Sequence, residues 1–127
     1  MKLRVLDDSL RLRLSRAEVD VLASDGAVEA ATRFPGGGEL AYRLEAGDGF
    51  AASEDAGVVT VTVPDDEVAA WASDETQVGL YARLDNGAGM LQVIVEKDFH
   101  CLIPRPGIDP ADFFPNPKTP RTILDGR

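Results

Sequence analysis

The chain has 127 residues, 44% of them hydrophobic, and is long enough to bury the core of one globular domain. It has a single cysteine, no apolar run near the roughly 20 residues of a membrane span, and charged residues where a secretion signal would be apolar. These features exclude an internal disulfide and predict a cytoplasmic protein without a membrane segment. The net charge of −9 favours solubility and disfavours general binding to nucleic acid.

Alternation of apolar and polar residues predicts eight β-strands along the chain. We expect them at residues 2–6, 10–14, 28–34, 39–45, 50–54, 58–63, 77–84 and 90–96. Short polar or glycine-rich turns join them in pairs, as in β-hairpins. The second strand shows the pattern most clearly, because its leucines face one side while Arg11 and Arg13 face the other.

Two short helices are predicted between the hairpins. The first begins after Ser15, which lies three residues before Glu18, the spacing of a reciprocal capping pair, and it ends at Gly26. The second begins with the acidic residues 65–67, which suit the positive end of the helix dipole. These carboxylates could also bind a cation, but no loop of alternating oxygen ligands surrounds them, so helix capping is the favoured interpretation.

The order strand–strand–helix–strand–strand occurs twice, and the two copies match in sequence. Residues 2–46 align with residues 50–96, and Leu22 of the first copy corresponds to Trp71 of the second. One copy of about 45 residues would bury too little surface to be stable alone, so the copies should share a core. We predict a mainly β (α+β) fold, a single barrel-like domain over residues 1–99 with pseudo-twofold symmetry, in which the hairpins of the two ββαββ copies interleave.

Residues 100–127 differ in composition, because six of the eight prolines lie between Pro104 and Pro120. Proline has no backbone N–H and disfavours both central strands and long helices, so this segment is predicted to be an extended tail. Its adjacent phenylalanines, Phe113 and Phe114, are expected to dock either on the domain itself or on a protein partner.

The first copy resembles a known DNA-binding unit. Its hairpin, Leu3–Val5 and Leu10–Leu14, followed by Ser15 and a short helix, resembles the swapped hairpin of AbrB/MazE-type regulators and antitoxins. In that family two chains pair, and basic side chains on the outer face grip DNA. The matching positions of the first copy are basic, namely Lys2, Arg4, Arg11 and Arg13. The second copy has alanine, serine and threonine types there, so the resemblance implies a DNA-binding regulator only as an alternative.

A second likeness covers nearly the whole chain. It rests on residues 2–5, Ser9–Val19, 95–99, Cys101-Leu102 and Phe114-Pro-Asn-Pro117. In these segments the chain is similar to a small bacterial family whose domain has no known function. This resemblance implies a free-standing cytoplasmic protein without an established activity.

The four basic residues also form a candidate binding face for a phosphate-bearing ligand or an acidic peptide. The alternative is a solvated hairpin face whose cations pair with Asp or Glu on neighbouring strands. The tail residues Phe113 and Phe114 complete the set of candidate binding residues.

Cys101, beside His100, is the candidate nucleophile of a thiol-dependent enzyme. Neighbouring residues of an extended segment point to opposite sides, and zinc would need ligands that a chain with one Cys and one His lacks. A buried, unreactive thiol is therefore favoured. Since no catalytic, cofactor or metal constellation is recognised, we predict a non-enzymatic binding module, a monomer or weak dimer, whose tail contacts a protein partner.

Overall fold

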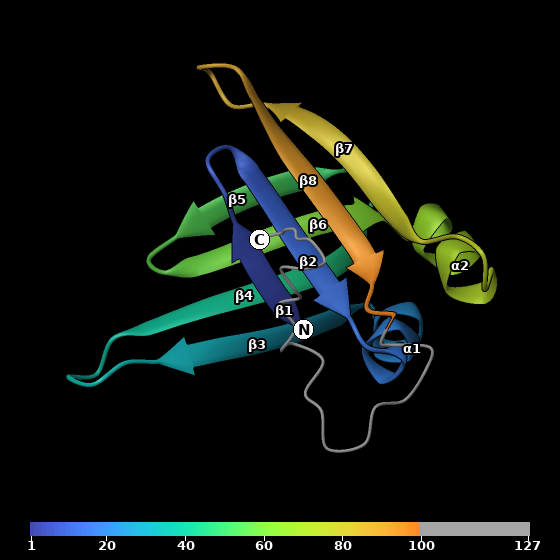
Figure 1. Ribbon diagram of the computed structural model, residues 1–127, viewed down its shortest axis with the longest axis horizontal. Coiled ribbons are helices and arrows are strands. Elements are labelled where there is room, and N and C mark those ends of the chain that lie inside the picture. Colours follow the sequence, from blue (N-terminus) through green and yellow to red (C-terminus); the bar gives the residue numbers. More distant parts are fainter. Residues whose placement is uncertain (100–127) are drawn as a thin grey trace, which may run out of the picture.

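The computed structural model describes residues 1–99 and contains eight strands and two helices (Figure 1). The strands are β1 (Lys2–Val5), β2 (Ser9–Leu14), β3 (Ala27–Arg33), β4 (Glu39–Gly47), β5 (Ala51–Asp55), β6 (Val58–Pro64), β7 (Gly79–Asp85) and β8 (Met90–Lys97). The helices are α1 (Arg16–Asp25) and α2 (Asp65–Ser73). The prediction of a mainly β chain with two short helices is confirmed.

The strands form two four-stranded sheets. The first sheet has the order β1-β2-β8-β7, and the second sheet has the order β3-β4-β6-β5. Each sheet therefore combines one hairpin from residues 2–47 with one from residues 51–97. The two hairpins of a sheet meet through a parallel central pair, β2 with β8 or β4 with β6, whereas all other pairs are antiparallel.

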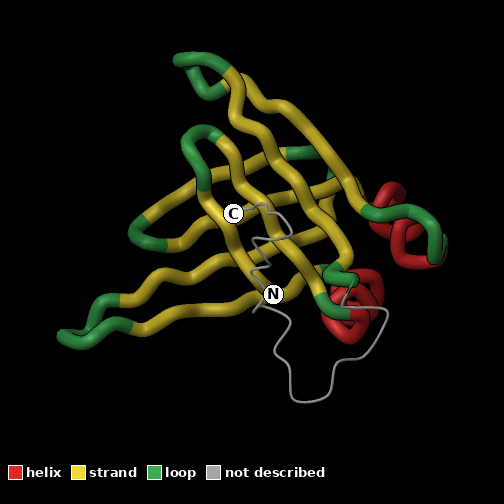
Figure 2. Tube along the Cα trace, in the orientation of Figure 1, coloured by secondary structure: helices red, strands yellow, loops and turns green. Residues whose placement is uncertain are grey.

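The predicted barrel is wrong, because the two sheets do not close on one another. Within residues 1–99, β1 and β7 are the edges of the first sheet and β3 and β5 the edges of the second, with no ladder between the sheets. The sheets cross as two layers, and both helices lie at one end (Figures 1 and 2). Each helix carries the chain from one sheet to the other, so the sheets are joined by helical connections and core packing instead of strand hydrogen bonds.

The core lies between the two sheets and under the helices. Alternate side chains of the central strands are fully buried, such as Leu12 and Leu14 on β2 and Val93 and Val95 on β8. Each helix contributes two buried residues, and Trp71 on α2 is the largest side chain in the core, with 0% exposure. Burial of these apolar faces is the main force that holds the layers together.

The first helix begins and ends as its sequence predicts. The Ser15 side chain accepts a hydrogen bond from the Glu18 N–H at 3.2 Å, and the Glu18 carboxylate accepts one from the Ser15 N–H at 2.9 Å. This reciprocal pair satisfies two backbone donors that the helix leaves open. Gly26 ends the helix with φ of 90°, a left-handed conformation that glycine adopts at little cost.

Candidate functional site

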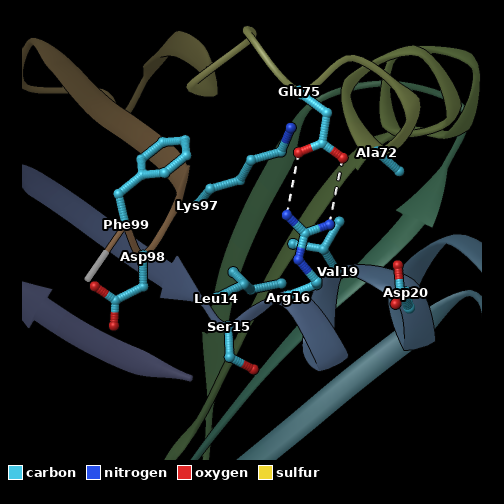
Figure 3. Close-up of a pocket in the computed structure, with 10 residues that line it drawn as sticks. All are labelled: Leu14, Ser15, Arg16, Val19, Asp20, Ala72, Glu75, Lys97, Asp98 and Phe99. Atoms are coloured by element: carbon cyan, nitrogen blue, oxygen red, sulfur yellow. Dashed lines mark hydrogen bonds and ion pairs between the residues drawn. The ribbon is translucent and has the colours of Figure 1, made fainter. Parts of the chain in front are cut away.

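A pocket of about 400 Å³ opens at the end of the molecule that carries the helices (Figure 3). It lies between the start of α1, the end of α2 and the end of β8. Its lining residues are Leu14, Ser15, Arg16, Val19, Asp20, Ala72, Glu75, Lys97, Asp98 and Phe99. This volume lies within the usual range for small-molecule sites, and the lining mixes apolar and charged groups.

An ion pair between Arg16 and Glu75 joins α1 to the segment that follows α2 (Figure 3). The two Arg16 Nη atoms donate to the two Glu75 carboxylate oxygens at 3.1 and 3.3 Å, which is a bidentate arrangement. Both side chains are more than 70% exposed, so the pair contributes little to stability. Hydrogen bonds from Arg16 and then its positive charge hold the pKa of Glu75 below its ordinary value.

Replacing Arg16 by glutamine should raise the pKa of Glu75 towards its ordinary value, because the hydrogen bonds and the charge are lost. Since a lowered carboxyl pKa stabilises the fold above the unfolded-state pKa, any contribution of this pair disappears as pH falls through the folded pKa. NMR titration of the Glu75 carboxyl carbon from about pH 2 to 6 measures the change. Arg33→Gln, which removes a distant exposed arginine, is the control. An unchanged Glu75 pKa in Arg16→Gln would contradict the pairing.

Lys97 and Asp98 fix the end of β8 beside the pocket. The Lys97 ammonium donates to the Asp74 carbonyl at 2.7 Å and lies 5.7 Å from the centre of the Trp71 ring. The Asp98 N–H donates to the Leu14 carbonyl at 2.8 Å, and its carboxylate pairs with Lys2. Four of the charged residues that line the pocket, Arg16, Glu75, Lys97 and Asp98, thus already have partners within the protein. No cluster of potential metal ligands occurs in residues 1–99.

A second candidate site is the outer face of the first sheet, where alternate side chains point away from the core. Five of the nine Lys and Arg residues in the range 1–99 lie there, and we call this surface the cationic face. Its basic residues are Lys2, Arg4, Arg11, Arg13 and Arg83. The register places them in adjacent rows, with Lys2 opposite Arg13 and Arg4 opposite Arg11.

Glu96 lies within the cationic face and neutralises part of it. Its Oε1 accepts from Arg11 Nε at 3.0 Å, and its Oε2 accepts from the Tyr81 hydroxyl at 3.3 Å. Arg13 Nε is 3.7 Å from the same carboxylate, too far for a hydrogen bond, and this buried nitrogen has no other partner in the described part of the chain. Partial loss of solvent, followed by the charge and hydrogen bonding of Glu96, raises the pKa of Tyr81.

Two cations of this face lie too far from any carboxylate of the described residues to form an ion pair. Arg4 and Arg83 have no ion pair within residues 1–99. The row that contains Arg4 and Arg11 continues through Ile94 to Tyr81, whose side chain is 56% exposed. The cationic face therefore combines free guanidinium groups with an aromatic and an aliphatic side chain.

The outer face of the second sheet has a different chemistry. Glu45 lies on β4 between β3 and β6, as Glu96 lies on β8 between β7 and β2. It accepts from Arg43 at 2.9 Å and from Thr62 at 3.2 Å. Hydrogen bonding from Arg43 lowers the pKa of Glu45. Arg43 also pairs with Glu29, and Arg33 pairs with Glu39. The arginines of this face are thus each matched by carboxylates, unlike Arg4 and Arg83.

The structure brings together the four basic residues that the sequence singles out, on one face of β1 and β2. Lys2, Arg11 and Arg13 form ion pairs with acidic residues, as expected for a solvated hairpin face, and Arg4 does not. Sequence reasoning missed Arg83, Tyr81 and the pocket. It predicted that the hairpins of the two copies interleave, but it did not identify the hairpin of β7 and β8 as the one beside β1 and β2. Cys101, Phe113, Phe114 and the rest of the tail lie outside the described residues.

Comparison with known proteins adds a family but no activity. The chain matches DUF7009, a family of unknown function, over residues 1–118. It belongs to this family. The match extends past residue 99, so the family sequence includes most of the predicted tail as well as the two sheets. No curated protein and no solved structure gives a significant match. The described residues contain no helix that is long and apolar enough to cross a membrane.

Proposed function

We propose that this member of DUF7009 is a non-enzymatic cytoplasmic binding module that engages an acidic protein segment through its cationic face. The supporting observation is the distribution of charge. Residues 1–99 carry 9 basic and 19 acidic residues, a net charge of −10, yet five of the basic residues project from one sheet face. A local surplus of positive charge on an acidic protein favours a complementary partner and accelerates its encounter.

The composition of the cationic face favours a protein partner. Arginine and tyrosine are enriched at protein–protein interfaces, and both occur here beside the aliphatic Ile94. Arg4 and Arg83 can pair with carboxylates of a partner without first releasing an internal ion pair. Guanidinium groups suit carboxylates particularly well, because they bind them in a planar, two-point arrangement.

Duplex DNA is a less suitable partner for this surface. The AbrB/MazE-type grip needs basic side chains on both halves, whereas β5 and β6 carry Ser53, Thr60 and Thr62 at the corresponding outer positions. A protein of this net charge also repels the phosphate backbone beyond the cationic face. We also propose that residues 2–46 and 50–96 are tandem repeats related by a pseudo-twofold axis. Only the first repeat has the basic residues at these outer positions.

The tail, residues 100–127, is proposed as a second contact region, with Phe113 and Phe114 as its apolar anchors. The family match, which extends to residue 118 and so includes both phenylalanines, supports this part of the proposal. The free protein is proposed to be a monomer or a weak dimer.

The contribution of the Arg4 charge to binding is measured as the affinity for fluorescein-labelled polyglutamate at low ionic strength. Arg4→Glu should weaken binding about tenfold, because an uncompensated attraction becomes a repulsion. Arg33→Glu is the matched control, since it makes the same charge change on the outer face of the second sheet, and it should change affinity less than about twofold. Equal losses in both variants, or no binding by the native protein, would overturn the proposal.

The same variants separate protein binding from DNA binding. A gel shift with duplex DNA at low salt should show no complex at micromolar protein. A DNA complex that Arg4→Glu abolishes would instead support the regulator function and overturn the acidic-partner proposal.

A further inference from the structure

Within residues 1–99, the edge of the first sheet beside β1 is open. β1 pairs only with β2 in the described part of the chain, so one side of its backbone has no strand neighbour. An open strand edge presents unpaired N–H and C=O groups that can accept another strand. What binds there is decided by which backbone groups point outward and which side chains flank them.

The hydrogen-bond pattern identifies the outward groups. In an antiparallel pair, opposite residues alternate between those that exchange backbone hydrogen bonds and those that do not. Leu6 N donates to Ser9 O at 3.1 Å, which makes this pair a bonded one. Counting back through the register, Arg4 and Lys2 also bond to β2, whereas Leu3 and Val5 direct their N–H and C=O groups to the open edge.

The side chains of β1 define two different rows along this edge. Lys2 and Arg4 point to the cationic face, and Leu3 and Val5 point to the core side, where Val5 remains 62% exposed. A partner strand beside β1 would place alternate side chains in each row, about 4.5–5.5 Å from their neighbours. Carboxylates suit the first row, and apolar side chains suit the second.

We propose that the partner of the cationic face binds by strand addition to the edge of β1, as an extended segment in which acidic and apolar residues alternate. This inference rests on the proposed function and adds the binding mode. The backbone of the segment would bond to Leu3 and Val5, its carboxylates would meet Lys2 and Arg4, and its apolar side chains would cover Val5. Main-chain hydrogen bonds supply affinity in this mode, and the alternating side chains supply specificity.

Two other occupants of the edge fit less well. A second copy pairing β1 with β1 would bring the lysine and arginine side chains of both copies together, and like charges on facing strands repel. The tail has six prolines between residues 104 and 120, each without the N–H that a paired strand uses. Charge complementarity therefore favours an acidic partner chain.

The test uses the full chain and a labelled peptide of four Glu-Val repeats, with acetylated and amidated ends. Val5→Pro removes the outward N–H without removing a bond to β2, and proline is tolerated when its missing N–H faces the open edge. Loss of one hydrogen bond should weaken binding about fivefold or more. Val5→Ala, which keeps the N–H, should weaken binding less, and far-UV circular dichroism should show that both variants are folded.

Amide hydrogen exchange gives an independent readout. Peptide binding should slow exchange at Leu3 and Val5, which gain partners, and leave Lys2 and Arg4 unchanged, because their amides already bond to β2. A peptide of the same composition in two blocks, four Glu followed by four Val, should bind more weakly than the alternating one, because it cannot fill both rows.

The outcomes distinguish the two proposals. If both peptides bind equally, Val5→Pro has no effect and Arg4→Glu still weakens binding about tenfold, strand addition is wrong while the acidic-partner function stands. If neither peptide binds, both proposals are wrong. If the protein self-associates and the peptide does not compete, the edge is an interface between copies and strand addition by a partner is wrong.

Discussion

Replacing Trp71 by alanine is expected to lower the free energy of unfolding by about 3–5 kcal/mol. The side chain is fully buried on α2, and its indole N–H donates to the Val78 carbonyl at 3.1 Å. Truncation therefore leaves a large cavity in the core. It also removes one of the two hydrogen bonds that the Val78 carbonyl accepts, the other being from the Lys97 N–H at 3.0 Å, and both effects destabilise the fold. Urea denaturation followed by far-UV circular dichroism measures the change, because the substitution removes the chain's single tryptophan.

Two further variants make this result specific. Trp71→Phe keeps an aromatic ring but loses the hydrogen bond, so its loss of stability should be clearly smaller than that of Trp71→Ala. Val21→Ala, at an exposed position on α1, should change stability by less than about 0.5 kcal/mol. A loss below about 1 kcal/mol in Trp71→Ala would contradict the place of α2 in the core.

The sequence of this chain predicts its strands, its buried side chains and the ends of its first helix. The alternation in β2 and β6 predicts which side chains are buried, and Leu12 and Val61 indeed lie in the core with 1% and 0% exposure. The capping pair of Ser15 and Glu18 predicts the start of α1, and Gly26 predicts its end. These features depend on residues close in the chain, where periodicity and side-chain chemistry act directly.

The arrangement of the hairpins follows from contacts that the sequence does not encode locally. The parallel pair of β2 and β8 joins residues more than 80 positions apart, such as Leu12 and Val95. A closed barrel and two crossed sheets bury the same alternating faces, so the hydrophobic pattern cannot choose between them. In the structure each helix carries the chain from one sheet to the other, and both helices lie at one end.

Some residues of the candidate sites can be predicted from the local sequence, whereas others are brought together only by long-range contacts. Lys2, Arg4, Arg11 and Arg13 belong to one hairpin, and their common face follows from the period of a strand. Arg83 joins them only because β8 lies beside β2 and β7 beside β8. The Arg16–Glu75 pair likewise joins residues 59 positions apart at the pocket.

This arrangement of strands gives the outer faces of the two sheets different charges. Glu96 lies on β8 between β7 and β2, and Glu45 lies on β4 between β3 and β6. Each accepts a hydrogen bond from an arginine, yet their surroundings differ. The first sheet surrounds its glutamate with more cations than one carboxylate neutralises. The second sheet has threonine and matched ion pairs at the equivalent places. The outer face of the first sheet thus has cations without an ion pair in residues 1–99, whereas the arginines on the outer face of the second sheet are each paired with carboxylates.

Replacing Gly79 by alanine is expected to destabilise the protein by about 1–3 kcal/mol, because the added Cβ has no room. An ideal Cβ at this position lies 2.5 Å from the Val95 carbonyl oxygen and 3.0 Å from the Tyr81 hydroxyl oxygen. The first contact is with the backbone of the neighbouring strand β8, so a side-chain rotation cannot relieve it. Gly79 is opposite Glu96 in the register, and its lack of a side chain leaves space for the Tyr81 hydroxyl to reach that carboxylate.

The substitution should also change the titration of Tyr81. If the added methyl group displaces the phenol from Glu96, the raised pKa of Tyr81 falls towards its ordinary value, because the nearby negative charge and hydrogen bond are lost. Ultraviolet titration in a Tyr42→Phe background isolates this hydroxyl. Gly49→Ala is the control, since no atom lies within 4 Å of its Cβ position and it lacks a left-handed φ. A stable Gly79→Ala variant with an unchanged Tyr81 pKa would contradict both the close approach of β7 to β8 and the role of Gly79 in shaping the cationic face.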